Sequence, residues 1–185
     1  MQKTNIRVAW KTGITCTILL LGLTTAGQSQ TAVQQCTSVS GTIAESVLPP
    51  GAAPNDPIGR TLATVTGDLR GAKTAILVSV APASNGGQTA VTKDVFVTEQ
   101  KDILVGDGSA KFSPITTGIP PNIEDVLTIK ITGGTGRYAK ATGSLTVVGL
   151  GQNVGPGTGF FTLTYTGSIC VPASALRPQA AESEQ

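Results

Sequence analysis

Residues 129–143 decide the fold of this chain and read I-K-I-T-G-G-T-G-R-Y-A-K-A-T-G. Isoleucine alternates with polar residues up to Ile131, as along a strand with one buried face. Gly133, Gly134 and Gly136 follow, and a second alternating run begins after Gly143. Glycine adopts a positive φ at little cost, so the pattern predicts a sharp turn between antiparallel strands. We expect at least one of the three glycines to have a positive φ.

The rest of the chain repeats this pattern of short alternating segments separated by Gly, Pro and Asn. It has neither a sustained helical period nor the strand–helix alternation of a parallel sheet. Strands are predicted at residues 37–47, 58–67, 73–81, 91–99, 103–112, 126–132, 144–150 and 159–169. The prediction is therefore one all-β domain, an eight-stranded antiparallel up-and-down barrel, with a two-sheet β-sandwich as the alternative.

The first 26 residues have the features of a signal peptide. Three basic residues precede an apolar run at 14–23, and small residues follow at Thr24 and Ala26. The run is shorter than the about 20 residues of a membrane-spanning helix, so we expect no stable membrane anchor. Cleavage after Ala26 would leave a flexible segment (27–35), the barrel (36–170) and a disordered tail (171–185). The predicted location is extracellular or periplasmic.

Composition excludes several classes of function. Cleavage would remove three of the 13 basic residues and none of the 11 acidic ones, which leaves a net charge of −1. No basic patch is then expected for nucleic acid. The chain has no histidine, which excludes His-based catalytic triads and His-ligated zinc. We predict no nucleic-acid partner, no metal and no cofactor.

Two cysteines remain after the predicted cleavage. Cys36 precedes the first predicted strand and Cys170 ends the last one. An exported protein meets oxidising conditions, and this placement suits adjacent terminal strands of a closed barrel. We predict a Cys36–Cys170 disulfide; the alternative is two unpaired buried thiols.

Alternation along the strands predicts which side chains face the interior. In the first strand, Val39 and Ile43 share a face with Glu45. A carboxylate on an apolar face has its pKa raised by desolvation unless it is paired. The alternative, which we favour, is that Glu45 reaches water at the barrel rim. Alternation does not decide whether Lys93 or Asp94 points inward.

In the last strand, Phe161, Leu163 and Tyr165 share the inner face. A buried Tyr165 hydroxyl needs a hydrogen-bond partner, and core packing is its expected role. Tyr138 is expected to pack at the barrel end beside Arg137, with both residues at the surface. The predicted lining of an apolar ligand site is Val39, Ile43, Phe161, Leu163 and Tyr165.

Four segments resemble the allene oxide cyclase barrel-like group: V-F-V-T (95–98), I-L-V-G-D (103–107), I-T-G-G-T-G-R-Y-A-K-A-T-G (131–143) and T-Y-T-G-S-I-C (164–170). Plant dirigent proteins are similar through the same Gly-Gly-Thr-Gly turn followed by an aromatic residue. The resemblance implies an eight-stranded barrel with an apolar cavity, often assembled as a homotrimer. The cyclases have a functional Glu in their first strand, so the resemblance makes Glu45 a candidate catalytic residue. Tyr165 is a second candidate.

Three functions follow as hypotheses. The first is a non-catalytic exported barrel that binds a small apolar molecule or acts through protein contacts. The second is an isomerase or cyclase of the allene oxide cyclase type acting on a hydrophobic substrate. The third is a structural surface or matrix protein whose barrel assembles.

Overall fold

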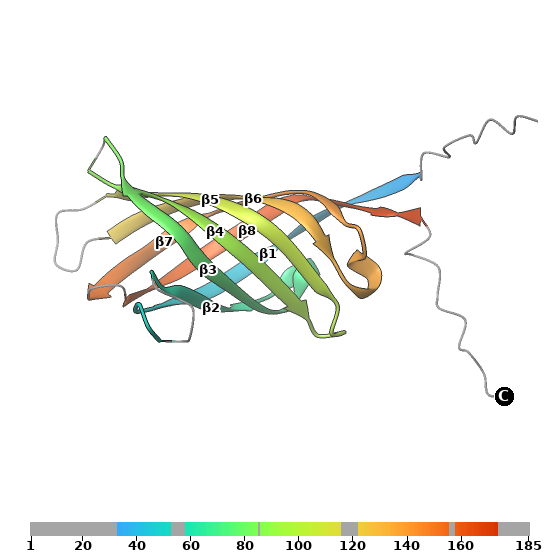
Figure 1. Ribbon diagram of the computed structural model, residues 1–185, viewed down its shortest axis with the longest axis horizontal. Coiled ribbons are helices and arrows are strands. Elements are labelled where there is room, and N and C mark those ends of the chain that lie inside the picture. Colours follow the sequence, from blue (N-terminus) through green and yellow to red (C-terminus); the bar gives the residue numbers. More distant parts are fainter. Residues whose placement is uncertain (1–32, 53–57, 85, 116–121, 156–157, 174–185) are drawn as a thin grey trace, which may run out of the picture. The chain divides into compact units, whose positions relative to one another are not determined.

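Eight strands form a closed antiparallel barrel in the computed structural model (Figure 1). The structure describes residues 33–52, 58–84, 86–115, 122–155 and 158–173, and the predicted signal peptide lies outside these ranges. The strands are β1 (Gln34–Leu48), β2 (Arg60–Val65), β3 (Gly71–Pro82), β4 (Gln88–Thr98), β5 (Ile103–Pro114), β6 (Asn122–Gly134), β7 (Thr142–Gly155) and β8 (Thr158–Pro172). Each strand pairs with the next, and β8 pairs with β1. The predicted up-and-down barrel is confirmed and the β-sandwich is excluded.

All eight predicted strands are present, and most extend beyond their predicted bounds. β1 begins at Gln34 and β8 ends at Pro172, so both strands run into the segments expected to be flexible or disordered. Pairing between the two explains the extension, since Gln34 lies opposite Pro172. β2 is shorter than predicted because the 3-10 helix η1 (Gly67–Leu69) begins two residues after it.

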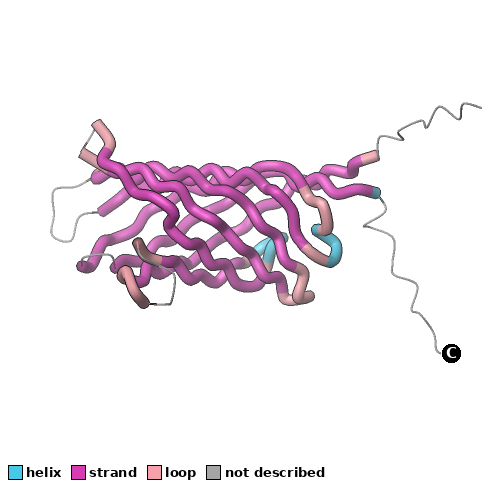
Figure 2. Tube along the Cα trace, viewed as in Figure 1, coloured by secondary structure: helices cyan, strands magenta, loops and turns pink. Residues whose placement is uncertain are grey.

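The two ends of the barrel differ. The end where β1 begins and β8 ends, called the terminal end, also carries the β2–β3, β4–β5 and β6–β7 connections. Both short 3-10 helices, η1 and η2 (Gly136–Tyr138), lie there (Figure 2). The β1–β2, β3–β4, β5–β6 and β7–β8 connections lie at the opposite end, called the cavity end.

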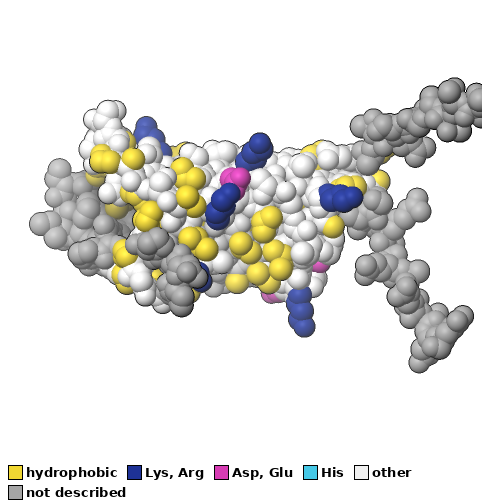
Figure 3. All heavy atoms as spheres, in the orientation of Figure 1, with side chains coloured by type: hydrophobic (Ala, Val, Ile, Leu, Met, Phe, Trp, Pro, Cys, Tyr) yellow, Lys and Arg dark blue, Asp and Glu magenta, His cyan; other side chains and the backbone are white. Residues whose placement is uncertain are grey.

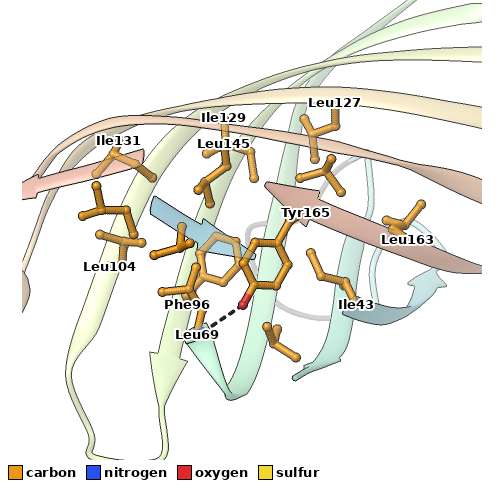
Figure 4. Close-up of a cluster of buried hydrophobic side chains, with 14 of the residues drawn as sticks. Ile43, Leu69, Phe96, Leu104, Leu127, Ile129, Ile131, Leu145, Leu163 and Tyr165 are labelled. Atoms are coloured by element: carbon orange, nitrogen blue, oxygen red, sulfur yellow. Dashed lines mark hydrogen bonds between the residues drawn. The ribbon is translucent and has the colours of Figure 1, made fainter. Parts of the chain in front are cut away.

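Large inward side chains fill the barrel toward the terminal end. Tyr165 and Phe96 are the largest fully buried ones (Figure 4). The Tyr165 hydroxyl accepts a hydrogen bond from the Leu69 N–H at 2.8 Å and donates one to the Thr66 carbonyl at 2.9 Å. The prediction that a buried Tyr165 needs a partner is confirmed. These two hydrogen bonds join β8 to the segment between β2 and β3.

The glycine-rich turn joins β6 to β7 as predicted. Gly136 has a φ of 56°, which confirms the expected positive φ. At Gly134 a Cβ would lie 2.1 Å from the Ile103 carbonyl oxygen and 2.9 Å from the Tyr138 Cβ. Tyr138 is only 8% exposed and packs on the core, so its predicted surface position is wrong. Tyr138 can pack there because Gly134 has no side chain. The Arg137 guanidinium stays outside, 4.8 Å from the centre of the Tyr138 ring.

A disulfide joins Cys36 to Cys170, as predicted. The two residues lie directly opposite each other in the β1–β8 ladder. The bond therefore fastens the first strand to the last at the terminal end, where the barrel closes.

The outer surface carries few charges and several apolar side chains. On the face that Figure 3 shows, hydrophobic groups lie between sparse charged ones. Lys93 of β4 pairs with Asp107 of β5 on this outer side, and both side chains are about half exposed. Alternation therefore places Lys93 outside and Asp94 inside, which the sequence left undecided. Within the described ranges, neither helical segment has the length or hydrophobicity of a transmembrane helix.

Candidate functional site

A cavity of about 470 Å³ occupies the barrel toward the cavity end. Its wall is largely apolar and comes from all strands except β7, with one further residue, Ile58, just before β2. The apolar side chains are Val47, Ile58, Ala75, Leu77, Val80, Ala110, Phe112, Ile123, Leu127 and Phe161. A space of this size and lining is typical of sites for small organic ligands.

The cavity exists because the inward residues are small on several strands. Ala75 of β3 and Ala110 of β5 line it, whereas Ile43 of β1, Phe96 of β4 and Leu104 of β5 fill inward positions nearer the terminal end. On β7 the inward residue near this end is Gly151, which touches Phe161. A Cβ on Gly151 would lie 2.3 Å from the Phe161 ring, so the glycine lets that ring lie flat against the wall.

Four ionisable side chains line the same cavity and are called the charged cluster: Glu45, Lys73, Asp94 and Asp125. They lie where the core ends. Along β4, Asp94 is the inward residue next to the core residue Phe96, and along β6, Asp125 is next to Leu127. One side of the cluster therefore meets packed apolar side chains, and the other meets the cavity.

Lys73 forms two ion pairs within this cluster. Its Nζ lies 2.8 Å from Oε2 of Glu45 and 2.9 Å from Oδ1 of Asp94, and all three side chains are at least nine-tenths buried. Burial by itself would lower the pKa of Lys73, but attraction to Glu45 and Asp94 outweighs it and raises the pKa to about 12. Lys73 is therefore a fixed positive charge at neutral pH.

Asp94 is also held by a neighbour on its own strand. The Thr92 hydroxyl donates a hydrogen bond to Oδ2 of Asp94, while Oδ1 faces Lys73. Space for both side chains comes from Gly108 of β5, where a Cβ would lie 2.0 Å from the Thr92 hydroxyl. Both oxygens of Asp94 thus have partners.

Asp125 is the unpaired member of the cluster. It is 3% exposed, and its Oδ1 has no hydrogen-bond partner among the described residues. Burial raises the pKa of Asp125 to about 7, repulsion from Glu45 adds to the rise, and attraction to Lys73 opposes it. Across the barrel on β2, the buried Thr61 hydroxyl likewise lacks a partner in the described part of the chain. Two unsatisfied polar groups therefore line one cavity.

The cavity differs from the predicted lining of the ligand site. Of the five predicted residues only Phe161 lines the cavity. Val39, Ile43, Leu163 and Tyr165 are buried in the core instead. Alternation identified their inward face correctly, but it does not tell how far along the barrel each side chain lies. Tyr165, a candidate catalytic residue, does not line this cavity, and its hydroxyl is hydrogen-bonded to the Leu69 N–H and the Thr66 carbonyl.

Glu45 lies in the cavity wall, and the solvated position that we favoured for it is wrong. Its side chain is 8% exposed because Lys73 pairs with it inside the barrel. Lys73 and Asp125 were missed, and Asp94 was left undecided against Lys93. Alternation could have found Lys73, which shares its face with Ala75 and Leu77, and Asp125 falls one residue before the predicted sixth strand.

The described ranges contain no group of three or more His, Cys, Asp or Glu side chains that could hold a metal ion. Two carboxylates of the charged cluster, Glu45 and Asp94, instead pair with a lysine ammonium, which supplies the positive charge itself.

Comparisons with known proteins add the following. No protein-family model matches the chain, and no curated protein matches it in sequence. Among solved structures, a pterocarpan synthase dirigent protein matches 76% of this chain and 87% of its own, with a TM-score of 0.29 and 12% identity. The resemblance of the glycine turn to dirigent proteins and to the allene oxide cyclase barrel-like group stays a prediction.

Proposed function

We propose that this protein is an exported β-barrel that binds a small, largely apolar molecule in its cavity without transforming it. The observation that carries the proposal is the cavity of about 470 Å³, walled mainly by Ile58 and by apolar side chains of β1, β3, β5, β6 and β8. Folding alone does not need such a space, because filling it with larger side chains would add stability. The predicted signal peptide and the disulfide support export.

Binding of a neutral fluorescent dye tests this proposal. Nile red should bind the purified protein with an increase in fluorescence, and Ala110→Phe should abolish that increase because the new ring occupies the cavity. Ala44→Phe is the matched control, since Ala44 lies on the outer face of β1. Equal binding by Ala110→Phe and the unchanged protein, with both folded by circular dichroism, would rule out the cavity as the site. Mass spectrometry of co-purifying small molecules would then identify the natural ligand.

A second candidate function is isomerisation or cyclisation of a hydrophobic substrate. The position of the buried Glu45 carboxylate in the cavity wall favours it, and Asp125 adds a carboxyl group whose pKa of about 7 suits proton transfer near neutral pH. The test is turnover of an unsaturated fatty-acid epoxide by the unchanged protein and by Glu45→Gln. Turnover equal to the uncatalysed rate would exclude this function and leave ligand binding in place.

A further inference from the structure

We propose that the ligand of this cavity is a cation: an apolar body that carries a protonated amine, with the ammonium bound by Asp125. The inference rests on the proposed function, namely that the cavity holds a small molecule, and adds the chemical class of that molecule. It is carried by the charge balance of the charged cluster and by the two unpartnered polar groups of the wall.

The charge balance of the cavity is negative. Three carboxylates line it, on β1, β4 and β6, against one ammonium, Lys73 on β3. Lys73 already pairs with two of these carboxylates, because its Nζ lies within 3 Å of both Glu45 and Asp94. The lining residues from β2, β5 and β8 are uncharged. Asp125 therefore has no cationic partner among the described residues, and an incoming positive charge would supply one.

Hydrogen bonding points to the same kind of ligand. Oδ1 of Asp125 and the Thr61 hydroxyl are both buried, line the cavity and lack a partner in the described structure. An ionised carboxylate only accepts hydrogen bonds, and an alkylammonium only donates them. Such charge-assisted bonds are about twice as strong as neutral ones. The hydroxyl on β2, four strands from β6 around the barrel, offers a second acceptor to a ligand that spans the cavity.

The apolar wall restricts the rest of the ligand. Beyond the charged cluster the lining consists mainly of Val, Leu, Ile, Ala and Phe side chains, which offer no partner to a second charge. A ligand carboxylate would meet three carboxylates of the same charge, and Lys73, the one cation among the described residues that line the cavity, already pairs with two of them. A neutral alcohol would bind the apolar wall but leave the Asp125 charge uncompensated. A protonated amine on a compact hydrocarbon satisfies both parts of the cavity.

Calorimetry with three probes of one hydrocarbon body tests the inference. The probes are 1-adamantylmethylamine, 1-adamantanemethanol and adamantane-1-carboxylate, titrated into the purified protein at pH 8. We expect the amine to bind at least about tenfold more tightly than the alcohol, with the carboxylate weakest. Lowering the pH to 6 should weaken amine binding about tenfold, because Asp125 then becomes protonated. Glu45 and Asp94, the other carboxylates of the wall, remain paired with Lys73.

Asp125→Asn keeps the size of the side chain and removes the charge, so it should abolish the preference for the amine without weakening alcohol binding. Asp107→Asn removes an exposed outer carboxylate and should change neither. Equal affinity for amine and alcohol at pH 8, or a preference for the amine that Asp125→Asn leaves intact, would overturn this inference but leave the proposed function standing. Binding of none of the three probes would overturn both.

Discussion

Glu45 and Lys73 lie two strands apart in one cross-strand row of the barrel, with Ala63 of β2 directly between them. Their charged groups meet at 2.8 Å inside the barrel. The small side chain at position 63 leaves the inner surface clear between the two. An ion pair that the sequence separates by 28 residues is thus set by strand register alone.

Replacing Lys73 should destabilise the protein strongly. Lys73→Met keeps the length of the side chain but leaves Glu45 and Asp94 buried without a counter-ion, which costs about 3–5 kcal/mol when a buried pair is broken. Urea unfolding followed by circular dichroism measures the change. Lys93→Met is the matched control, because Lys93 pairs with Asp107 in solvent and such pairs contribute about 0–1 kcal/mol. Equal losses in the two variants would contradict the role given to the buried pair.

Asp125 should make the free energy of unfolding depend on pH, because the pKa of its carboxyl group differs between the folded protein and the unfolded chain. Its pKa is about 7 in the folded protein and 3.8 in the reference state, so the folded state holds the proton more tightly. The protonated Asp125 carboxyl group therefore contributes its whole share of the unfolding free energy below pH 3.8, and this contribution is lost as the pH rises to about 7. Asp125→Asn removes the dependence. The difference in unfolding free energy between this variant and the unchanged protein should grow by on the order of 4 kcal/mol over that window.

The measurement is a series of urea unfolding curves from pH 4 to pH 8 for both proteins. The variant should be relatively more stable at the alkaline end. A difference that stays constant with pH would show that Asp125 is solvated or paired in the folded protein.

The sequence predicted the fold better than the site, for a physical reason. Side chains alternate along a strand with a period of two, so the inward faces of β1 and β8 follow directly from the sequence. The period does not reveal how far along the barrel a side chain lies. Ile43 and Glu45 share a face, yet one packs in the core and the other borders the cavity. That boundary depends on which inward positions of the different strands lie at the same level, which is a property of the assembled barrel.

The glycine turn gives a sharp test of local geometry. Gly134→Ala places a Cβ 2.1 Å from the Ile103 carbonyl oxygen, a backbone atom that can move only with β5. The melting temperature should fall markedly, and Tyr138 should become more exposed to solvent. Gly86→Ala is the control: Gly86 has a φ of 77° but no atom within 4 Å of the added Cβ, so it costs only the backbone strain of about 1 kcal/mol. A smaller loss at position 134 than at position 86 would refute the close-packing argument.

The Tyr165 hydroxyl should contribute to stability and not to ligand binding. Tyr165→Phe leaves the Leu69 N–H and the Thr66 carbonyl without their partner, and an unsatisfied buried group costs about 1–3 kcal/mol. Affinity for Nile red should stay the same, since Tyr165 does not line the cavity. Thermal unfolding and dye titration on the same preparation separate the two effects. Lost dye binding with unchanged stability would restore Tyr165 as a residue of the site.

The disulfide should likewise act on stability alone, because it lies at the terminal end and the cavity lies toward the other. Cys36 and Cys170 enclose a loop of 134 residues, for which the chain-entropy model gives roughly 5 kcal/mol at most. Intact mass of the exported protein should show no free thiol until it is reduced and alkylated.

Reduction should then lower the unfolding free energy by about 2–5 kcal/mol while β1 and β8 remain paired along the rest of their ladder. The cavity should keep its affinity for Nile red at temperatures where the reduced protein is still folded. If reduction abolished binding before unfolding, the closure of the barrel at Cys36 would control the shape of the cavity, and the independence of the two ends would be refuted.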